Sequence, residues 1–206
     1  ILGIFYFLDK IKSQQAIDTF QNSIIISQYP FFEDKSKFDL TARSAIVFEK
    51  NSRVVVYAKD SSFRFSPAST TKIMTALVAL DHYRLDQIIT VPELSSVKGS
   101  VMGLEEGERI LFKNLLFGLM LPSGNDAAYT LAYNYPGGVE SFVKAMNKKA
   151  KDLKLENTRF FDPSGYRDEN YTTAFDLARL AAYALDNQTL RDIVETKYNT
   201  VSDITG

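Results

Sequence analysis

The stretch Pro67-Ala68-Ser69-Thr70-Thr71-Lys72-Ile73-Met74-Thr75-Ala76-Leu77 decides how this 206-residue chain is interpreted. Pro67 interrupts the pattern before it, and apolar residues then recur at helical spacing between residues 73 and 80. This periodicity predicts a helix that begins at Ser69. Lys72 follows three residues later, so that its side chain would share a helix face with Ser69.

A serine hydroxyl beside a lysine amine is a candidate nucleophile with its base. The hydroxyl is a poor nucleophile until a base removes its proton. Lys72 can act as that base if burial and the positive end of the helix dipole lower its pKa from about 10.4. The N–H of Ser69 at the helix start is a candidate oxyanion donor. The alternative is that Ser69 only caps the helix.

The spacing alone is weak evidence, because Ser-x-x-Lys occurs three times, as Ser69/Lys72, Ser95/Lys98 and Ser141/Lys144. The second pair lies in a polar loop. The third lies inside a helical pattern, where we expect its lysine to be solvated. Only the first pair follows a proline and opens an apolar helix, and it is therefore the pair predicted to carry chemistry.

A second candidate group, Ser123-Gly124-Asn125, is the one Ser-x-Asn in the chain. It follows Pro122 in a break between two predicted helices, since proline disfavours helical geometry in the residue before it. Asn125 could cap the helix that follows. A capping role and a catalytic role are compatible.

The rest of the chain indicates an α+β fold, because a hairpin is followed mostly by helices. The hairpin is predicted from two β-branched and aromatic runs at 44–48 and 54–58. Helices are predicted around residues 112–119, 125–132, 139–146 and 173–184. Thr173 and Asp176 resemble a capping box at the start of the last helix, and residues 157–171 are predicted to form a loop.

Composition excludes several classes of protein. The chain has 24 Lys and Arg against 25 Asp and Glu, a net charge of -1, which argues against a dedicated nucleic-acid binder. It has no cysteine, which excludes disulfides, a cysteine nucleophile and thiolate metal sites. The single histidine, His82, excludes a His-rich zinc site, and we expect it to face solvent. No metal or cofactor is predicted.

The quoted motifs together resemble the D-alanyl-D-alanine carboxypeptidases, the low-molecular-mass penicillin-binding proteins of serine peptidase family S11. Residues 67–77 are similar to the first active-site box of the family, and residues 115–128 to its approach to the second. Residues 161–165 and 172–178 are similar to later segments, although many members have His where Ser164 stands. The order and spacing agree from about residue 40 to about residue 200.

The resemblance implies a DD-peptidase/β-lactamase-like fold, with an antiparallel sheet flanked by helices and a mainly helical lobe. It implies that Ser69 attacks the penultimate D-Ala carbonyl of a peptidoglycan stem peptide and that Lys72 is the general base. Ser123 would relay the proton to the leaving D-Ala. Asn125 would hold the substrate amide and orient the lysine. β-Lactams would acylate the same serine, and the enzyme would work outside the cytoplasm in the bacterial envelope.

The chain departs from the family at its C-terminus. The third box of such enzymes is Lys-Thr-Gly, whereas Ile204-Thr205-Gly206 lacks the lysine. We interpret this as truncation before that box, with the C-terminal strands missing from this chain. Two alternatives stay open: a non-catalytic peptidoglycan-binding pseudoenzyme, and a serine β-lactamase, whose second box usually reads Ser-Asp-Asn.

The chain is predicted to divide at about residue 38. Residues 1–38 would be an N-terminal apolar stub and linker, and residues 39–206 the incomplete catalytic domain. The run at residues 1–8 is too short to cross a bilayer, which takes about 20 apolar residues. It is either the remnant of a signal peptide or anchor or an ordinary buried or interfacial helix, and any membrane anchor would lie outside this chain.

Overall fold

The structure, a computed structural model, describes residues 40–204. These residues fall into two compact units, one of residues 47–57 and one of residues 40–46 with 58–204. The prediction for the N-terminal stub at residues 1–38 lies outside the described residues.

The predicted hairpin is confirmed. Strands β1 (Ala45–Phe48) and β2 (Val55–Lys59) pair in a two-stranded sheet. In the turn between them, the Glu49 N–H donates to the Val54 carbonyl at 2.9 Å. The Glu49 carboxylate accepts hydrogen bonds from Ser52 and then Asn51, and these hold the pKa of Glu49 below its usual value.

The second unit begins its helical part with a short 3₁₀ helix, Ala68–Thr71, which leads directly into α2 (Lys72–His82). The prediction that the α-helix begins at Ser69 is therefore wrong by one turn. The Thr70 N–H bonds to the Pro67 carbonyl at 3.2 Å, three residues back, which is the 3₁₀ pattern. Ser69 lies inside this turn and is not the N-cap of α2, which is Thr71.

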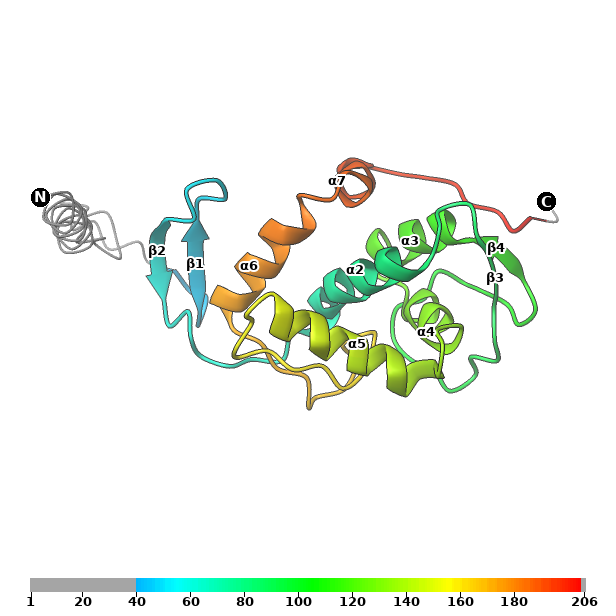
Figure 1. Cartoon of the computed structure of the whole chain (residues 1–206), viewed down its shortest axis with the longest axis horizontal. Coiled ribbons are helices and arrows are strands. Elements are labelled where there is room, and N and C mark those ends of the chain that lie inside the picture. The colour runs from blue at the N-terminus through cyan, green and yellow to red at the C-terminus, as the bar shows by residue number, and fades with distance from the viewer. Residues whose placement is uncertain (1–39, 205–206) are drawn as a thin grey trace, which may run out of the picture. The chain divides into compact units, whose positions relative to one another are not determined.

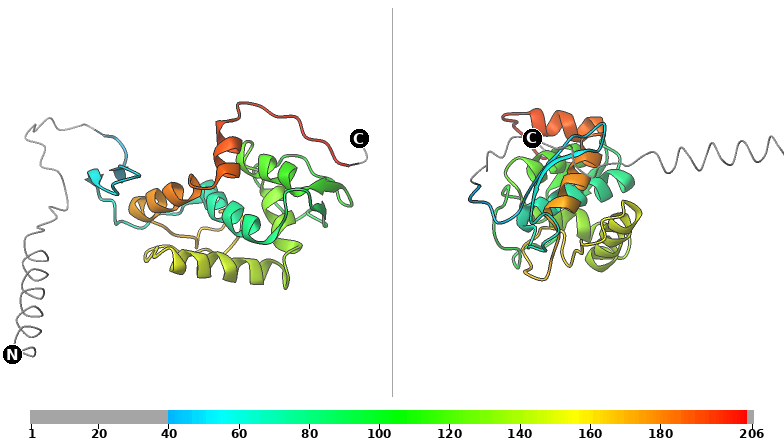
Figure 2. Two further views of the ribbon diagram at one scale, coloured as in Figure 1. Left: turned by 45° about the horizontal axis from the view of Figure 1, so that its top comes forward. Right: turned by 90° about the vertical axis from the view of Figure 1, so that its left-hand side faces the viewer.

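Five further helices follow: α3 (Phe112–Met120), α4 (Asn125–Tyr133), α5 (Gly138–Asp152), α6 (Ala174–Ala184) and α7 (Gln188–Glu195). The first four confirm the predicted helices, and α7 was not predicted. Helix α2 packs against α3, α4, α5 and α6, and α7 packs against α3. Figures 1 and 2 show α2 running through the middle of these helices.

Helix α2 is apolar on almost every side because it lies inside the core of this unit. Residues 74–79 of α2 are all buried, and a helix that is apolar on every side is a buried helix. Around it lie fully buried side chains of the neighbouring helices, which include Leu116, Leu119, Leu131, Phe142 and Met146. Lys72 is the first residue of this helix, so the fold takes its side chain into the same interior.

A second small sheet was not predicted. Strand β3 (Ile88–Thr90) pairs antiparallel with β4 (Arg109–Leu111), with Ile89 opposite Ile110. Each strand has only three residues, too few for an alternating pattern to show in the sequence. The loop between β3 and β4, residues 91–108, reaches the candidate site described below.

The predicted capping box at the start of α6 is confirmed in one of its two bonds. The Thr173 hydroxyl accepts the Asp176 N–H at 3.1 Å. The Asp176 carboxylate accepts instead from the Asn157 N–H and the Thr158 hydroxyl, at 2.8 Å each. Asp176 thus ties the loop before α6 to the start of that helix.

None of the helices between residues 40 and 204 has the length and apolar character needed to cross a membrane.

Candidate active site

Ser69 and Lys72 face each other at the start of α2. Ser69 is exposed, whereas Lys72 is only 1% exposed. The Lys72 Nζ lies 3.4 Å from the Ser69 Oγ. Side chains three residues apart nearly eclipse one another in a 3₁₀ turn, and this turn therefore places the amine beneath the hydroxyl. The arrangement presents a serine hydroxyl, the candidate nucleophile, to solvent with an amine behind it.

Burial determines the acid–base character of Lys72. It lowers the pKa of the amine to about 8, because desolvation disfavours the ammonium form. The carboxylates of Asp162 and Asp126 act in the opposite direction and keep the pKa from falling further. The Nζ also donates to the Ser164 carbonyl at 2.9 Å. An amine with this pKa is close to half neutral at pH 8 and can accept a proton there.

The backbone of residues 163–165 lies along the face of α2 and its 3₁₀ turn that carries Lys72. The Pro163 carbonyl accepts from the Thr75 hydroxyl at 2.5 Å, and the next carbonyl along accepts from Lys72. Gly165 has a φ of +81°, and a Cβ on it would stand 1.8 Å from the Ala68 carbonyl oxygen. Sequence reasoning noted this segment but gave it no role. Its signal was Asp162 followed by Pro-Ser-Gly, a turn composition in which the aspartate side chain bonds to the backbone after it.

Asn125 is the first residue of α4, and Gly124 is its N-cap, without a side-chain capping bond. The prediction that Asn125 could cap this helix is therefore wrong. Its Nδ2 donates to the Lys98 carbonyl at 2.6 Å, and its N–H donates to the Ser100 carbonyl at 2.7 Å. The buried amide thus holds the segment 98–100 beside the start of α4. Lys98, from the second Ser-x-x-Lys match, contributes its main chain here.

Ser123 precedes Gly124, the N-cap of this helix, and has a strained conformation. Its φ is +62°, and Ala68, just before Ser69, has a φ of +48°. Left-handed geometry costs a residue with a Cβ about 1–3 kcal/mol, and it recurs at functional sites. The Ser123 Oγ is buried and forms no hydrogen bond within the described part of the chain. It is a hydroxyl whose hydrogen-bonding capacity is still available.

Asp126 fixes the loop that continues from the 98–100 segment. Its carboxylate accepts the N–H groups of Met102, Gly103 and Leu104 at 2.9–3.1 Å. Gly99 packs closely against its neighbours: a Cβ at Gly99 would stand 2.6 Å from the Asn125 Nδ2 and 3.4 Å from the Tyr166 ring. Segments 98–100 and 164–166 therefore meet next to Asn125.

The other candidate groups lie in ordinary surroundings. His82 is exposed, as expected, and its ring packs against Tyr83 and Tyr135. Lys144 on α5 is exposed and forms an ion pair with Glu140 at 2.6 Å. Between residues 40 and 204, no group of three or more His, Cys, Asp or Glu side chains is placed to hold a metal ion.

A hollow of about 810 Å³ lies elsewhere, between α5 and the 158–171 segment. Neither Ser69, Lys72, Ser123 nor Asn125 lines it. Its basic side chains have partners of their own, since Lys144 pairs with Glu140, Arg167 pairs with Glu169, and the Arg159 guanidinium lies over the Phe161 ring. The exposed serine and the buried amine are therefore the stronger candidate site.

The comparisons with known proteins agree on one family. The model of the Peptidase S11 family, D-alanyl-D-alanine carboxypeptidase, matches residues 32–203. The D-alanyl-D-alanine carboxypeptidase DacF of Bacillus subtilis is 40% identical over 172 residues, which are 80% of this chain and 41% of that protein. A D-alanyl-D-alanine endopeptidase of Pseudomonas aeruginosa is 40% identical over 145 residues, 69% of this chain and 47% of that protein.

Solved structures agree with these relatives. A mutant of a Streptomyces DD-transpeptidase matches with a TM-score of 0.75 and 36% identity, over 80% of this chain and 68% of that one. A D-alanyl-D-alanine carboxypeptidase of Mycobacterium tuberculosis matches with a TM-score of 0.73 and 32% identity, over 79% of this chain and 65% of that one. The predicted DD-peptidase-like α+β fold is confirmed. The chain spans about half the length of the two curated relatives named above.

Proposed function

Because the chain belongs to the D-alanyl-D-alanine carboxypeptidase family, peptidase family S11, we propose that it is the serine-type catalytic part of a D-Ala-D-Ala carboxypeptidase. The observation that carries the proposal is the exposed Ser69 hydroxyl 3.4 Å from a buried amine whose pKa is about 8. The substrate class is the peptidoglycan stem peptide that ends in D-Ala-D-Ala.

The first half-reaction forms an acyl-enzyme on Ser69. Neutral Lys72 takes the hydroxyl proton while the Oγ bonds to the carbonyl carbon of the penultimate D-Ala. The tetrahedral intermediate then collapses, the C–N bond breaks, and the proton passes to the nitrogen of the leaving D-Ala. Ser123 serves as the relay in this step, and its buried, unpaired Oγ in the described part of the chain supports that role.

The second half-reaction hydrolyses the ester. Lys72, neutral again after the first step, removes a proton from water as the water attacks the acyl carbon. The Ser69 oxygen leaves and recovers its proton, and the shortened peptide departs. Each step needs the amine close to Ser69 and partly neutral. The 3₁₀ turn supplies the first condition, and burial of Lys72 supplies the second.

Asn125 binds the substrate amide in this proposal. Its side chain is held at its Nδ2 by the Lys98 carbonyl, which aims the amide from the start of α4. The same anchoring fixes the 98–100 segment as one wall of the peptide site. The predicted second role of Asn125, to orient Lys72, stays a prediction, and the Ser164 carbonyl is a direct hydrogen-bond partner of that amine.

The same serine is the proposed target of β-lactams, whose strained amide mimics the D-Ala-D-Ala bond and leaves a slowly hydrolysed ester. The substrate lies outside the cytoplasm, and we therefore place the enzyme in the bacterial envelope. The chemistry of the serine and lysine requires no cofactor.

Intact mass after incubation with benzylpenicillin tests the proposal in the full-length protein. We expect a one-to-one adduct that is absent in Ser69→Ala and present in Ser141→Ala, the matched control on α5. Release of D-Ala from a peptide that ends in Lys-D-Ala-D-Ala should follow the same pattern. An unlabelled wild-type protein would overturn the proposal and favour a peptidoglycan-binding pseudoenzyme. Penicillin hydrolysed faster than peptide would favour a β-lactamase.

A further inference from the structure

Asp162 is a buried carboxylate that the proposed reaction does not yet use. It is 1% exposed and accepts five hydrogen bonds. The donors are the N–H groups of Ser164, Gly165 and Tyr166, at 3.3, 3.2 and 3.1 Å, the Ser164 hydroxyl at 2.5 Å and the Asn170 amide at 2.6 Å. A carboxylate with this many donors is held in a single position. The Asp162 carboxylate thus lies at the centre of the hydrogen bonds within the loop 162–170.

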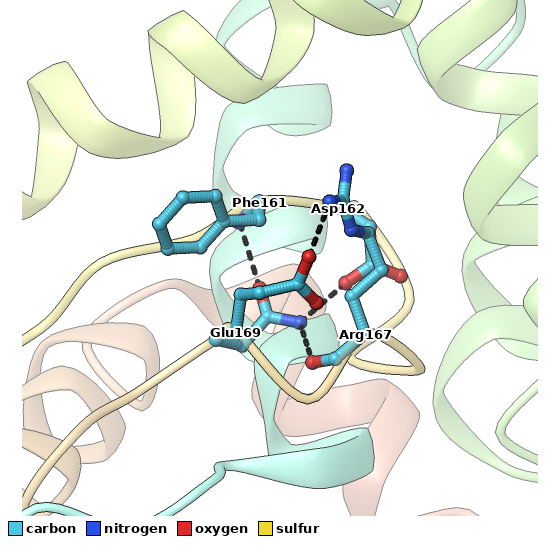
Figure 3. Close-up of polar contacts among 5 residues, drawn as sticks. Phe161, Asp162, Arg167 and Glu169 are labelled. Carbon is cyan, nitrogen blue, oxygen red and sulfur yellow. Dashed lines mark hydrogen bonds and ion pairs between the residues drawn. The ribbon is translucent and has the colours of Figure 1, made fainter.

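Neighbouring residues of the same loop hold Asp162 and its hydrogen-bond donors in place. Figure 3 shows Asp162 in a network with Phe161, Arg167 and Glu169. The Arg167 guanidinium pairs with the Glu169 carboxylate, and the Asn170 amide bridges the Arg167 carbonyl to Asp162. The carboxylate of Asp162 is therefore bound to loop amides and a hydroxyl, and the arginine of the network is engaged with another acid.

The segment that Asp162 holds is the one that contacts the nucleophile turn. Three of its donors belong to Ser164 and Gly165, and the carbonyl of Ser164 is the acceptor for Lys72. Gly165 lies against Ala68, the residue before the nucleophile. The chain of contacts thus runs from the carboxylate through one residue's backbone to the amine.

We propose that Asp162 is a positioning residue for this reaction, which fixes the Ser164 carbonyl so that the Lys72 amine stays beneath Ser69. The inference rests on the proposed function, since it assigns a role toward the acylation of Ser69. It adds to the motif residues a carboxylate that contacts neither the substrate nor Ser69.

Asp162 affects Lys72 through its negative charge as well as through the position of the Ser164 carbonyl. The charged groups that act on the amine are Asp162, from the loop, and Asp126, from α4. Asp162 also acts on Tyr129, on α4, and on Arg167, in its own loop. Loss of the Asp162 charge would leave burial less opposed and lower the pKa of Lys72. A purely structural role for Asp162 predicts no such change.

The test is the pH profile of acylation by benzylpenicillin in the full-length protein. The second-order rate constant reports the pKa of the free enzyme's base. For Asp162→Asn we expect a lower plateau, and we expect the rising limb on the acid side of that plateau to move to lower pH by about one unit. Asp176→Asn is the matched control, because Asp176 is also buried and hydrogen-bonded but is not among the charges that act on Lys72. We expect its limb to stay at the wild-type position.

Asp162→Glu is the second variant, and it keeps the proposal testable if Asp162→Asn does not fold. It retains the charge but moves the oxygens by one methylene. We expect the limb to stay and the plateau to fall about 10- to 100-fold, as for a small misplacement of a reacting group. A wild-type plateau in Asp162→Glu, or an unmoved limb in folded Asp162→Asn, would overturn the inference. A wild-type protein that is not acylated at all would instead overturn the proposed function.

Discussion

The pairs Ser69/Lys72 and Ser141/Lys144 share one spacing on one chain and have opposite surroundings. Lys72 begins a helix whose residues 74–79 are all buried, and its amine has a pKa of about 8. Lys144 lies on the outer face of α5, with its side chain 72% exposed and paired with Glu140. The comparison teaches that desolvation, rather than the three-residue spacing, turns a lysine into a base at neutral pH.

The largest expected effect comes from replacing each lysine by methionine. Lys72→Met removes the base while filling similar volume, and we expect acylation by benzylpenicillin to fall about 10²- to 10⁴-fold. Lys144→Met should keep the wild-type rate. Stopped-flow or mass measurements of adduct formation decide this, with circular dichroism as the check on folding. Equal losses in both variants would break the comparison.

The next effect concerns the backbone behind the nucleophile. Gly165→Ala places a Cβ against the Ala68 carbonyl at a φ of +81°, whereas Gly107→Ala at a φ of +86° meets nothing within 4 Å. Both should lose about 1–2 kcal/mol of stability from the left-handed conformation, and Gly165→Ala should lose more, because its Cβ forces the backbone at Ala68 to move. Only Gly165→Ala should also slow acylation, by about 10-fold or more. Thermal melting with acylation rates separates the two, and equal rates would contradict the role assigned to the 163–165 segment.

A third prediction sharpens the comparison through pH. Lys72 acts as base only when neutral, so acylation of wild-type protein should rise with pH and level off above about pH 8. Below that point it should fall about tenfold per unit, since the neutral fraction does. Lys144→Met should reproduce the same limb. A profile without a limb between pH 6 and pH 10 would show that Lys72 is not the titrating base.

The smallest expected effect is that of Glu140→Gln, which removes the partner of Lys144. Exposed ion pairs of this kind contribute little, because solvent screens them. We expect neither the acylation rate nor the melting temperature to change measurably. A clear loss of acylation would give the outer face of α5 a role that its exposed surroundings do not suggest.

Helices with long apolar periodicity, and the hairpin, could be predicted from the sequence. The 3₁₀ turn before α2 could not, because its geometry depends on a left-handed Ala68 that no residue preference signals. Strands β3 and β4 were too short to show alternation. Helix α7 carries an Asn187 cap that accepts the Leu190 N–H, a local signal that was present in the sequence but not used.

The candidate site divides in the same way. Ser69 and Lys72 share one turn, so their closeness follows from local spacing. The contact between Lys72 and Ser164 joins residues 92 positions apart, and that between Asn125 and Lys98 joins residues 27 apart. Such contacts depend on tertiary packing, which the sequence pattern does not encode locally. Asp162 was overlooked for the same reason, since its importance comes from where its loop lies.

The placement of residues 163–165 behind the nucleophile turn bears on drug resistance. If the proposed function holds, substitutions at Asp162 or Gly165 would change susceptibility to β-lactams without contacting the antibiotic. They would act through the Ser164 carbonyl that binds Lys72 and through the contact of Gly165 with Ala68. Such changes would slow the natural reaction as well, since both reactions share the same serine. Selection for resistance at this segment would therefore be limited by the cell's need for a working wall enzyme.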